Sequence, residues 1–142
     1  MNPLAAILLL VMFVIIGFIA FQIERKRIYQ RQGRFSERPS RSINSIYQQH
    51  YKNEGYYESD FAHLWITIAQ LLHLDQKKLS PFDELKHELG PGKGHFGPSE
   101  IDDVIDFLLK ECKVREISED KLEHLKTLDD CVKLICKRVT PH

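Results

Sequence analysis

Residues 61–74, FAHLWITIAQLLHL, decide the fold class, because their apolar positions repeat at the spacing of an α-helix. Side chains three and four residues apart lie on one face of a helix, whereas a strand alternates every second residue. The apolar positions of this segment are Phe61, Leu64, Trp65, Ile68, Leu71 and Leu72. We therefore predict a helix that buries this face, with Asp60 as its N-cap.

The same period recurs in two segments further along the chain. A second helix is predicted from about Glu100 to Cys112, with Ser99 as its N-cap, and a last helix over residues 128–139, with Thr127 as its N-cap. The inward positions are Ile101, Val104, Ile105, Leu108 and Leu109 in the second helix, and Leu128, Cys131, Val132, Ile135 and Val139 in the last.

Two shorter segments complete this part of the chain. A short helix is predicted after its cap, Ser118, and residues 75–90 are predicted to form a long ordered loop. The core anchors of that loop are expected to be Leu79, Phe82, Leu85 and Leu89. No strand-like alternation of any length occurs. We therefore predict an all-α domain over residues 61–140, a bundle of four helices of which one is short.

An uninterrupted apolar run opens the chain. LAAILLLVMFVIIGFIAF, residues 4–21, holds 18 residues and no charge. At about 1.5 Å per residue, this length is close to the thickness of the hydrocarbon core of a bilayer. A cleaved signal peptide has basic residues before its apolar run and a small-residue cleavage site after it. Nothing basic precedes this run, so we predict an uncleaved transmembrane anchor over residues 1–22.

Basic residues flank the run only on its C-terminal side, and the nearest are Arg25, Lys26, Arg27 and Arg31. The positive-inside rule then predicts a single-pass protein of the inner (cytoplasmic) membrane, with its N-terminus outside and its C-terminal domain in the cytoplasm. The bilayer is thus its first expected partner.

Residues 23–60 are predicted to form a basic neck, which first continues the helix and then becomes a polar linker. Its arginines either hold anionic headgroups or only set the topology. Its tyrosines either pack on the domain or lie near the membrane interface; they are Tyr47, Tyr51, Tyr56 and Tyr57.

The formal charge of the chain is zero, but it is unevenly distributed. Residues 22–41 hold seven basic and two acidic residues, a net charge of +5, and residues 61–142 hold 12 basic and 15 acidic residues, a net charge of −3. A nucleic-acid binder normally has a basic domain, so this class is excluded. The three cysteines, Cys112, Cys131 and Cys136, lie on apolar helical patterns and are expected to be buried free thiols.

Two stretches resemble the acyl carrier protein family. LHLDQKKLSPFDELKHELG, residues 72–90, resembles the end of the family's first helix and the loop after it, and ISEDKLEHLKTLDDCVKLI, residues 117–135, resembles its third and fourth helices. The resemblance covers roughly residues 61–138. It implies the carrier fold, in which a long first helix and a loop precede an acidic second helix.

The resemblance also implies where the family's chemistry belongs. In carrier proteins, a serine in an Asp-Ser-Leu motif holds a 4'-phosphopantetheine arm at the start of the second helix. Here Glu100 stands at the serine position and Ser99 at the aspartate position, and residues 91–98 look like an insertion. The chain therefore resembles the arm-less, carrier-like bacterial domains of unknown function. We interpret Ser99 as a helix cap, with a phosphopantetheine site as the alternative.

An acidic face is predicted on the second helix, formed by Glu100, Asp102, Asp103 and Asp106. In carrier proteins the equivalent face meets basic patches of partner enzymes, whereas a solvated face favoured by the helix dipole is the alternative. No histidine or cysteine pattern has metal-ligand spacing, and no catalytic arrangement can be argued.

Three hypotheses follow from these features. The first is a non-enzymatic interaction module that needs no cofactor and recruits a basic partner protein through the acidic helix and residues 91–98. The second is a membrane-tethered acyl carrier for lipid or envelope chemistry. The third is an accessory or immunity-type protein that binds a single partner.

Overall fold

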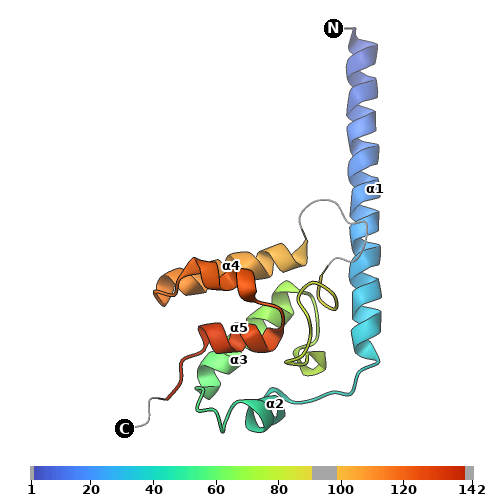
Figure 1. The fold of residues 1–142 in the computed structure, drawn as a ribbon. Helices are drawn as coiled ribbons and strands as arrows, with labels where there is room; N and C mark the ends of the chain where they lie inside the picture. Colours follow the sequence, from blue (N-terminus) through green and yellow to red (C-terminus); the bar gives the residue numbers. More distant parts are fainter. Residues whose placement is uncertain (1, 91–98, 140–142) are drawn as a thin grey trace. The chain divides into compact units, whose positions relative to one another are not determined.

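The computed structural model describes residues 2–90 and 99–139, and over these residues the chain is all-α (Figure 1). The described part holds two isolated β-bridges and no strand. The chain divides into two compact units, Met1–Arg34 and Phe35–His142. The predicted insertion at residues 91–98 lies outside the described residues.

The first unit consists of α1 (Pro3–Ser36) as far as Arg34, and the 34 residues of this helix correspond to a length of about 51 Å. Its apolar part has a mean hydropathy of 3.2, so by length and composition the helix is able to cross a membrane. A helix satisfies its backbone hydrogen bonds internally, as an apolar bilayer requires. The helix continues through the basic residues that follow Phe21, which confirms the predicted continuation.

The second unit takes up the rest of the predicted neck. It begins at Phe35 and includes α2 (Ile43–His50), whose N-cap Ser42 accepts a hydrogen bond from the backbone N–H of Ser45 at 3.0 Å. Of the neck tyrosines, Tyr57 is 46% exposed. The other three are buried in the core: Tyr47, Tyr51 and Tyr56. For these three, packing on the domain is therefore confirmed.

The core of this unit forms where α3 (Glu58–Leu71) contacts α2, α4 (Glu100–Val114) and α5 (Leu128–Ile135) (Figure 1). The predicted apolar face of α3 is buried at Phe61, Leu64, Trp65, Ile68 and Leu72. Rings pack along it, with centroids 4.9 Å apart for Tyr51 and Phe61 and 5.2 Å apart for Phe61 and Trp65. Burial of one such side chain contributes about 1.5–3 kcal/mol, so this face contributes substantially to the stability of the second unit.

The local helix signals have mixed outcomes. Thr127 caps α5 as predicted, because its hydroxyl accepts from the Asp130 N–H at 3.3 Å while the Asp130 carboxylate accepts from the Thr127 N–H at 3.0 Å. The short third helix is present as a 3-10 helix, η2 (Glu119–His124). The prediction for Asp60 is wrong, since α3 begins at Glu58 and Asp60 lies inside its first turn.

Helices α3 and α4 end in the same way, with a left-handed residue that is not glycine. His73 follows α3 with φ 56° and Glu116 follows α4 with φ 58°. In each case the next residue closes the turn: Leu74 N–H donates to the Ala69 carbonyl and Ile117 N–H donates to the Cys112 carbonyl, both at 2.9 Å. These are Schellman motifs, which usually hold glycine at the left-handed position.

The end of the chain departs from the prediction. Helix α5 ends at Ile135 rather than Val139, and Val139 is 49% exposed. The residues after α5 are extended and pair with the neck: Tyr57 N–H donates to the Lys137 carbonyl at 3.1 Å, and Val139 N–H donates to the Gly55 carbonyl at 2.6 Å. The extended backbone is thus satisfied by a segment about 80 residues earlier, which no local signal indicates.

The loop before residue 91 is ordered as predicted, with one exception. It contains a 3-10 helix, η1 (Gln76–Lys78), and it buries Leu79, Leu85 and Leu89. Phe82, however, is 70% exposed, so its prediction as a core anchor is wrong. Leu85 N–H donates to the Lys126 carbonyl at 2.8 Å, which holds the loop against the start of α5, and the exposed Phe82 ring meets the His50 ring at 5.7 Å between centroids.

Candidate functional site

Ser99 lies at the start of α4 and acts as its N-cap. Its backbone N–H donates to the Asp102 carboxylate at 2.6 Å, and its hydroxyl donates to the same oxygen at 3.4 Å. The side chain is nearly buried, with 8% of the residue exposed. The prediction that Ser99 caps this helix is confirmed, and the hydroxyl is directed at a carboxylate of its own helix.

The predicted acidic face of α4 separates into residues with different roles. Glu100 is buried, at 7% exposed. The Asp102 carboxylate accepts the capping hydrogen bond from Ser99. Asp103 and Asp106 are exposed one turn apart, and no residue within 2–90 or 99–139 forms an ion pair with either of them. The acidic surface available to a partner is therefore narrower than predicted, and we call Asp103 and Asp106 the acidic pair.

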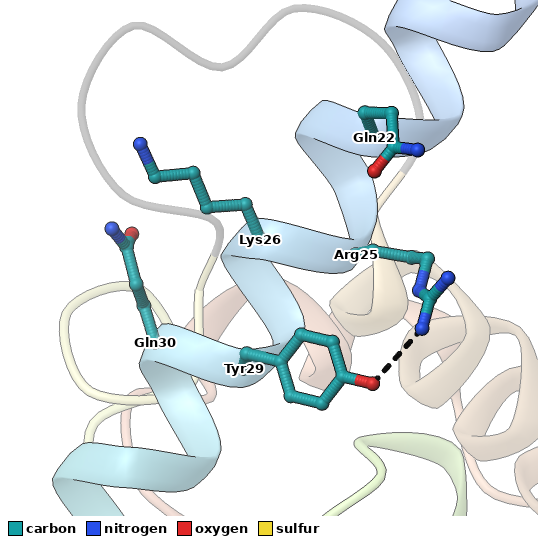
Figure 2. A pocket seen from close by; sticks show the side chains of 5 residues that line it. All are labelled: Gln22, Arg25, Lys26, Tyr29 and Gln30. Atoms are coloured by element: carbon teal, nitrogen blue, oxygen red, sulfur yellow. Dashed lines mark hydrogen bonds between the residues drawn. The ribbon is translucent and has the colours of Figure 1, made fainter.

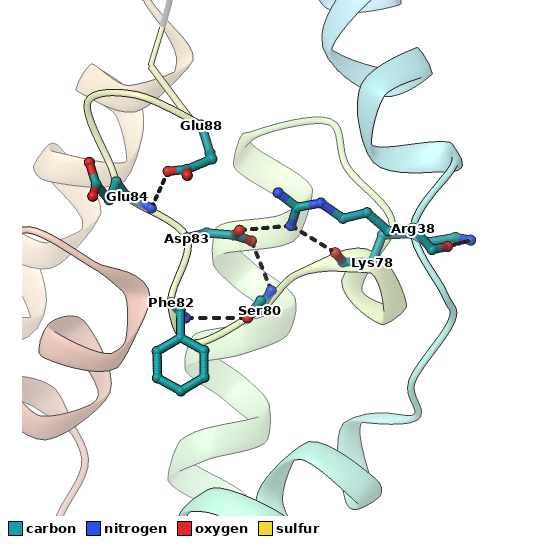
Figure 3. A network of polar contacts seen from close by, with 7 residues as sticks. All are labelled: Arg38, Lys78, Ser80, Phe82, Asp83, Glu84 and Glu88. Atoms are coloured by element: carbon teal, nitrogen blue, oxygen red, sulfur yellow. Dashed lines mark hydrogen bonds and ion pairs between the residues drawn. The ribbon is translucent and has the colours of Figure 1, made fainter.

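A partly buried ion pair joins the start of the second unit to the loop (Figure 3). The Arg38 guanidinium lies 2.7 Å from one oxygen of Asp83, whose side chain is 5% exposed. The second oxygen of Asp83 accepts from the Ser80 N–H at 2.8 Å. Burial raises the pKa of the Asp83 carboxyl although Arg38 and Ser80 favour its charged form. Sequence reasoning missed this pair, because 45 residues separate its members.

The same region forms a shallow groove at the surface. Arg38, Arg41 and Lys78 line it together with Glu88 and the exposed ring of Phe82. The Lys78 ammonium donates to the Arg38 carbonyl, as the stick view of this network indicates (Figure 3). The groove therefore presents both charge signs around one aromatic ring, which does not by itself specify a ligand.

A second polar cluster connects three elements at the far end of α4. The Asp60 carboxylate accepts from Arg115 and from the Lys137 N–H, both at 3.1 Å, while Arg115 also donates to Glu111 at 3.2 Å. Partial burial alone would raise the pKa of the Asp60 carboxyl. The Lys137 N–H and Arg115 outweigh that effect and lower the pKa below its ordinary value of 3.8. This cluster ties the extended end of the chain to the first turn of α3.

The residues predicted to flank the membrane fall into two groups on α1. Arg25 and Lys26 are exposed, and Arg25 donates to the Tyr29 hydroxyl at 3.1 Å (Figure 2). Arg27 lies 3.6 Å from Glu24, and Arg31 is buried.

No metal centre is apparent in residues 2–90 and 99–139. These ranges hold no group of three or more His, Cys, Asp or Glu side chains able to bind a metal ion. The three cysteines are free and buried, as predicted. Burial raises the pKa of the Cys131 and Cys136 thiols to about 12, so both stay protonated at neutral pH and are poor nucleophiles.

Comparison with known proteins adds no relative. No protein-family model, no curated protein and no solved structure matches this chain. The likeness to acyl carrier proteins stays a prediction.

Proposed function

We propose that the chain is a single-pass protein of the inner membrane whose helical second unit is a non-enzymatic interaction module in the cytoplasm. The observation that carries the proposal is α1, an apolar helix long enough to cross a bilayer that continues without a break into a basic segment. Because the flanking basic residues are all C-terminal to the apolar run, the second unit is assigned to the cytoplasm.

The surface proposed to meet a partner protein is the acidic pair. Asp103 and Asp106 are exposed on a helix that is rigidly capped, and the described residues leave both without an ion pair. A basic patch on the partner would complement them, and such charges mainly raise the association rate and select the partner. The order α3, loop, α4, η2 and α5 supports treating this unit as carrier-like, with partner docking on its second long helix.

The test compares two charge-matched double variants of the full chain in native membranes. In D103N/D106N the acidic pair is neutralised, whereas in E54Q/E123Q two exposed acids on other segments are neutralised. Cross-linking followed by mass spectrometry identifies the bound proteins. We expect a partner that is lost from D103N/D106N and retained by E54Q/E123Q, with retention falling as salt rises. If both variants retained the same partners, the acidic pair would not be the docking surface.

The carrier alternative is separated by one measurement. It requires the Ser99 hydroxyl to receive a 4'-phosphopantetheine arm, whereas that hydroxyl is directed at Asp102 and nearly buried. Intact mass after co-expression with a broad-specificity phosphopantetheinyl transferase should be unchanged. A mass increase of one phosphopantetheine arm, absent in Ser99→Ala, would contradict the interaction-module proposal and favour a membrane-tethered carrier. For the accessory or immunity-type alternative, no residue of the chain discriminates, and the neighbouring genes are the observation that would separate it.

A further inference from the structure

The outward side of α4 carries acids along its first half and lysines along its second half. Helix α4 packs against α3 and α5 (Figure 1), and its other side is exposed. At 3.6 residues per turn, the side chains of this exposed side that form one continuous stripe lie within about 120° of one another. All of them are exposed or partly exposed, and we call them the α4 stripe: Asp103, Asp106, Phe107, Lys110, Lys113 and Val114.

The charges of the α4 stripe are symmetric about position 108. Asp103 and Lys113 each lie five residues from this position, and Asp106 and Lys110 each lie two residues from it. A twofold axis through position 108, perpendicular to the helix, places an antiparallel copy of the stripe opposite the first. Each acid of one copy then faces a lysine of the other copy, so the stripe is complementary to itself.

Forces within a single helix account for only part of this pattern. The helix dipole favours acids in the first turn and bases in the last turn, which covers Asp103 and Lys113. Asp106 and Lys110 lie in the middle of α4, where the dipole has little effect. Their spacing of four residues also suits a pair within the helix, but neither side chain forms an ion pair in the part of the chain that the structure describes.

The contacts that the stripe does make leave it open to a second helix. Lys113 lies 3.8 Å from Glu119, but the two side chains are 70% and 55% exposed, and an ion pair this exposed contributes little. The partly exposed Phe107 ring meets the His63 ring edge-on, with 6.3 Å between centroids. Phe107 is one residue from position 108, so two symmetry-related rings approach each other near the axis and add an apolar contact between the charged pairs.

We propose that two copies of the chain associate through the α4 stripe as an antiparallel helix pair. Asp103 of each copy faces Lys113 of the other, and Asp106 faces Lys110. This inference rests on the proposed function, since it names a second copy of the chain as the partner of the acidic pair. One pair of 15-residue helices buries less surface than a stable complex in dilute solution needs. The anchor α1 compensates, because it confines both copies to one membrane and raises their effective concentration.

Förster resonance energy transfer (FRET) between full-length chains in native membranes tests the pairing. Donor and acceptor fluorescent proteins are fused to the C-terminus, and wild-type chains should show transfer. The stripe becomes basic throughout in D103K/D106K and acidic throughout in K110D/K113D. Each variant should associate with itself on the order of tenfold more weakly than the wild type, because every charged pair becomes repulsive.

Co-expression of the two variants decides the proposal. A D103K/D106K chain opposite a K110D/K113D chain has attraction at every charged pair, so their mixed FRET should reach at least the wild-type level. Misfolding of a variant would lower its signal alone and would not restore the signal in the mixture. The control E54K/E123K reverses two exposed acids on other segments and should keep the wild-type FRET. Mixed FRET no higher than that of either variant alone would overturn the α4 stripe as the interface.

The cross-linking test of the acidic pair separates this inference from the proposed function. If the wild type shows no FRET while a different protein is cross-linked to it and lost from D103N/D106N, the second copy is overturned and the docking surface stands. If neither FRET nor a partner sensitive to D103N/D106N is found, both proposals are overturned. Cross-links of the chain to itself that disappear in D103N/D106N would support both.

Discussion

The carboxylate of Asp83 lies 2.7 Å from the guanidinium of Arg38, and this contact joins the first residues of the second unit to the loop that precedes α4. The Arg38 guanidinium also lies 4.0 Å from the centroid of the Phe35 ring. One arginine therefore connects the exit of α1 to the loop through an ion pair and holds the aromatic residue at that exit.

Removal of Arg38 should destabilise the second unit. Arg38→Gln leaves the Asp83 carboxylate buried with the Ser80 N–H as its remaining donor, and loss of one partner of a largely buried pair costs about 2 kcal/mol here, below the range for a fully buried pair because Arg38 is partly exposed. Urea unfolding of the full chain in detergent, followed by the fluorescence of Trp65, measures the effect. Arg41→Gln, an exposed arginine of the same segment, is the control.

The loss of stability in Arg38→Gln should depend on pH. The pKa of Asp83 is already raised in the folded protein, and removal of Arg38 raises it further. Between the unfolded and folded pKa values the folded state then binds more protons, so stability falls as pH rises through this window. The deficit of Arg38→Gln should be largest near pH 7 and shrink toward pH 4. A deficit independent of pH would show that Asp83 is not the group left uncompensated.

Replacement of Glu116 by glycine should stabilise the protein. Glu116 has φ 58°, a conformation that glycine adopts without the steric penalty of a side chain. We expect Glu116→Gly to raise the free energy of unfolding by about 0.5–1 kcal/mol, and His73→Gly, with φ 56°, to act in the same direction. Lys110→Gly, inside α4, should instead lower it by about 1 kcal/mol. Equal losses for all three variants would contradict the left-handed assignments.

Low pH should remove the stability that the Asp60 carboxylate contributes to the folded protein. The folded-state pKa of Asp60 lies below its ordinary value of 3.8, so the unfolded state binds more protons in the window between the two. The stability contributed by this carboxylate is present above pH 3.8 and is lost as pH falls through the folded pKa. Asp60→Asn should cost about 1–2 kcal/mol at pH 6, and this cost should decrease as the pH falls below 3.8. Asp103→Asn, an exposed acid, should show no such pH-dependent difference.

The three thiols should be protected in the folded state. Cys112, Cys131 and Cys136 are buried, and burial raises the pKa of each thiol. A disulfide reagent at pH 8 should therefore modify them only at the rate of unfolding, and all three at once in urea. Lys121→Cys, at an exposed position, is the positive control and should react at once. Rapid modification of a native cysteine would contradict its burial.

Local patterns account for α1, α3, α4 and α5, whereas α2, which lies in the segment predicted as a polar linker, was not predicted. The apolar repeats in α3 and α4, and the capping residues Ser99 and Thr127, act over one or two turns and can be recognised from spacing alone. The apolar run of α1 is recognised in the same way, because length and composition are sufficient to make a helix that fits a bilayer. For the same reason the sequence indicated the buried cysteines.

Sequence spacing alone did not predict which of the candidate residues are exposed. The sequence placed Glu100 and Asp102 on one acidic face with Asp103 and Asp106, but Glu100 is buried, and Asp102, although exposed, accepts the capping hydrogen bond from Ser99. Likewise, hydropathy ranks Phe82 with Leu85, although Leu85 is buried and Phe82, whose ring meets that of His50, is exposed. Exposure is a property of the assembled unit, since it depends on what the other segments cover.

By itself, then, the sequence determined an all-α chain with an apolar N-terminal helix and capped helices α4 and α5, because helix formation and capping are satisfied by near neighbours. The tertiary structure alone decided that the neck belongs to the second unit, that residues 136–139 are extended beside residues 55–57, and that Arg38 meets Asp83. These contacts join residues 45 to about 80 positions apart. Such pairs form only when packing brings distant segments together, so no local periodicity of the sequence predicts them.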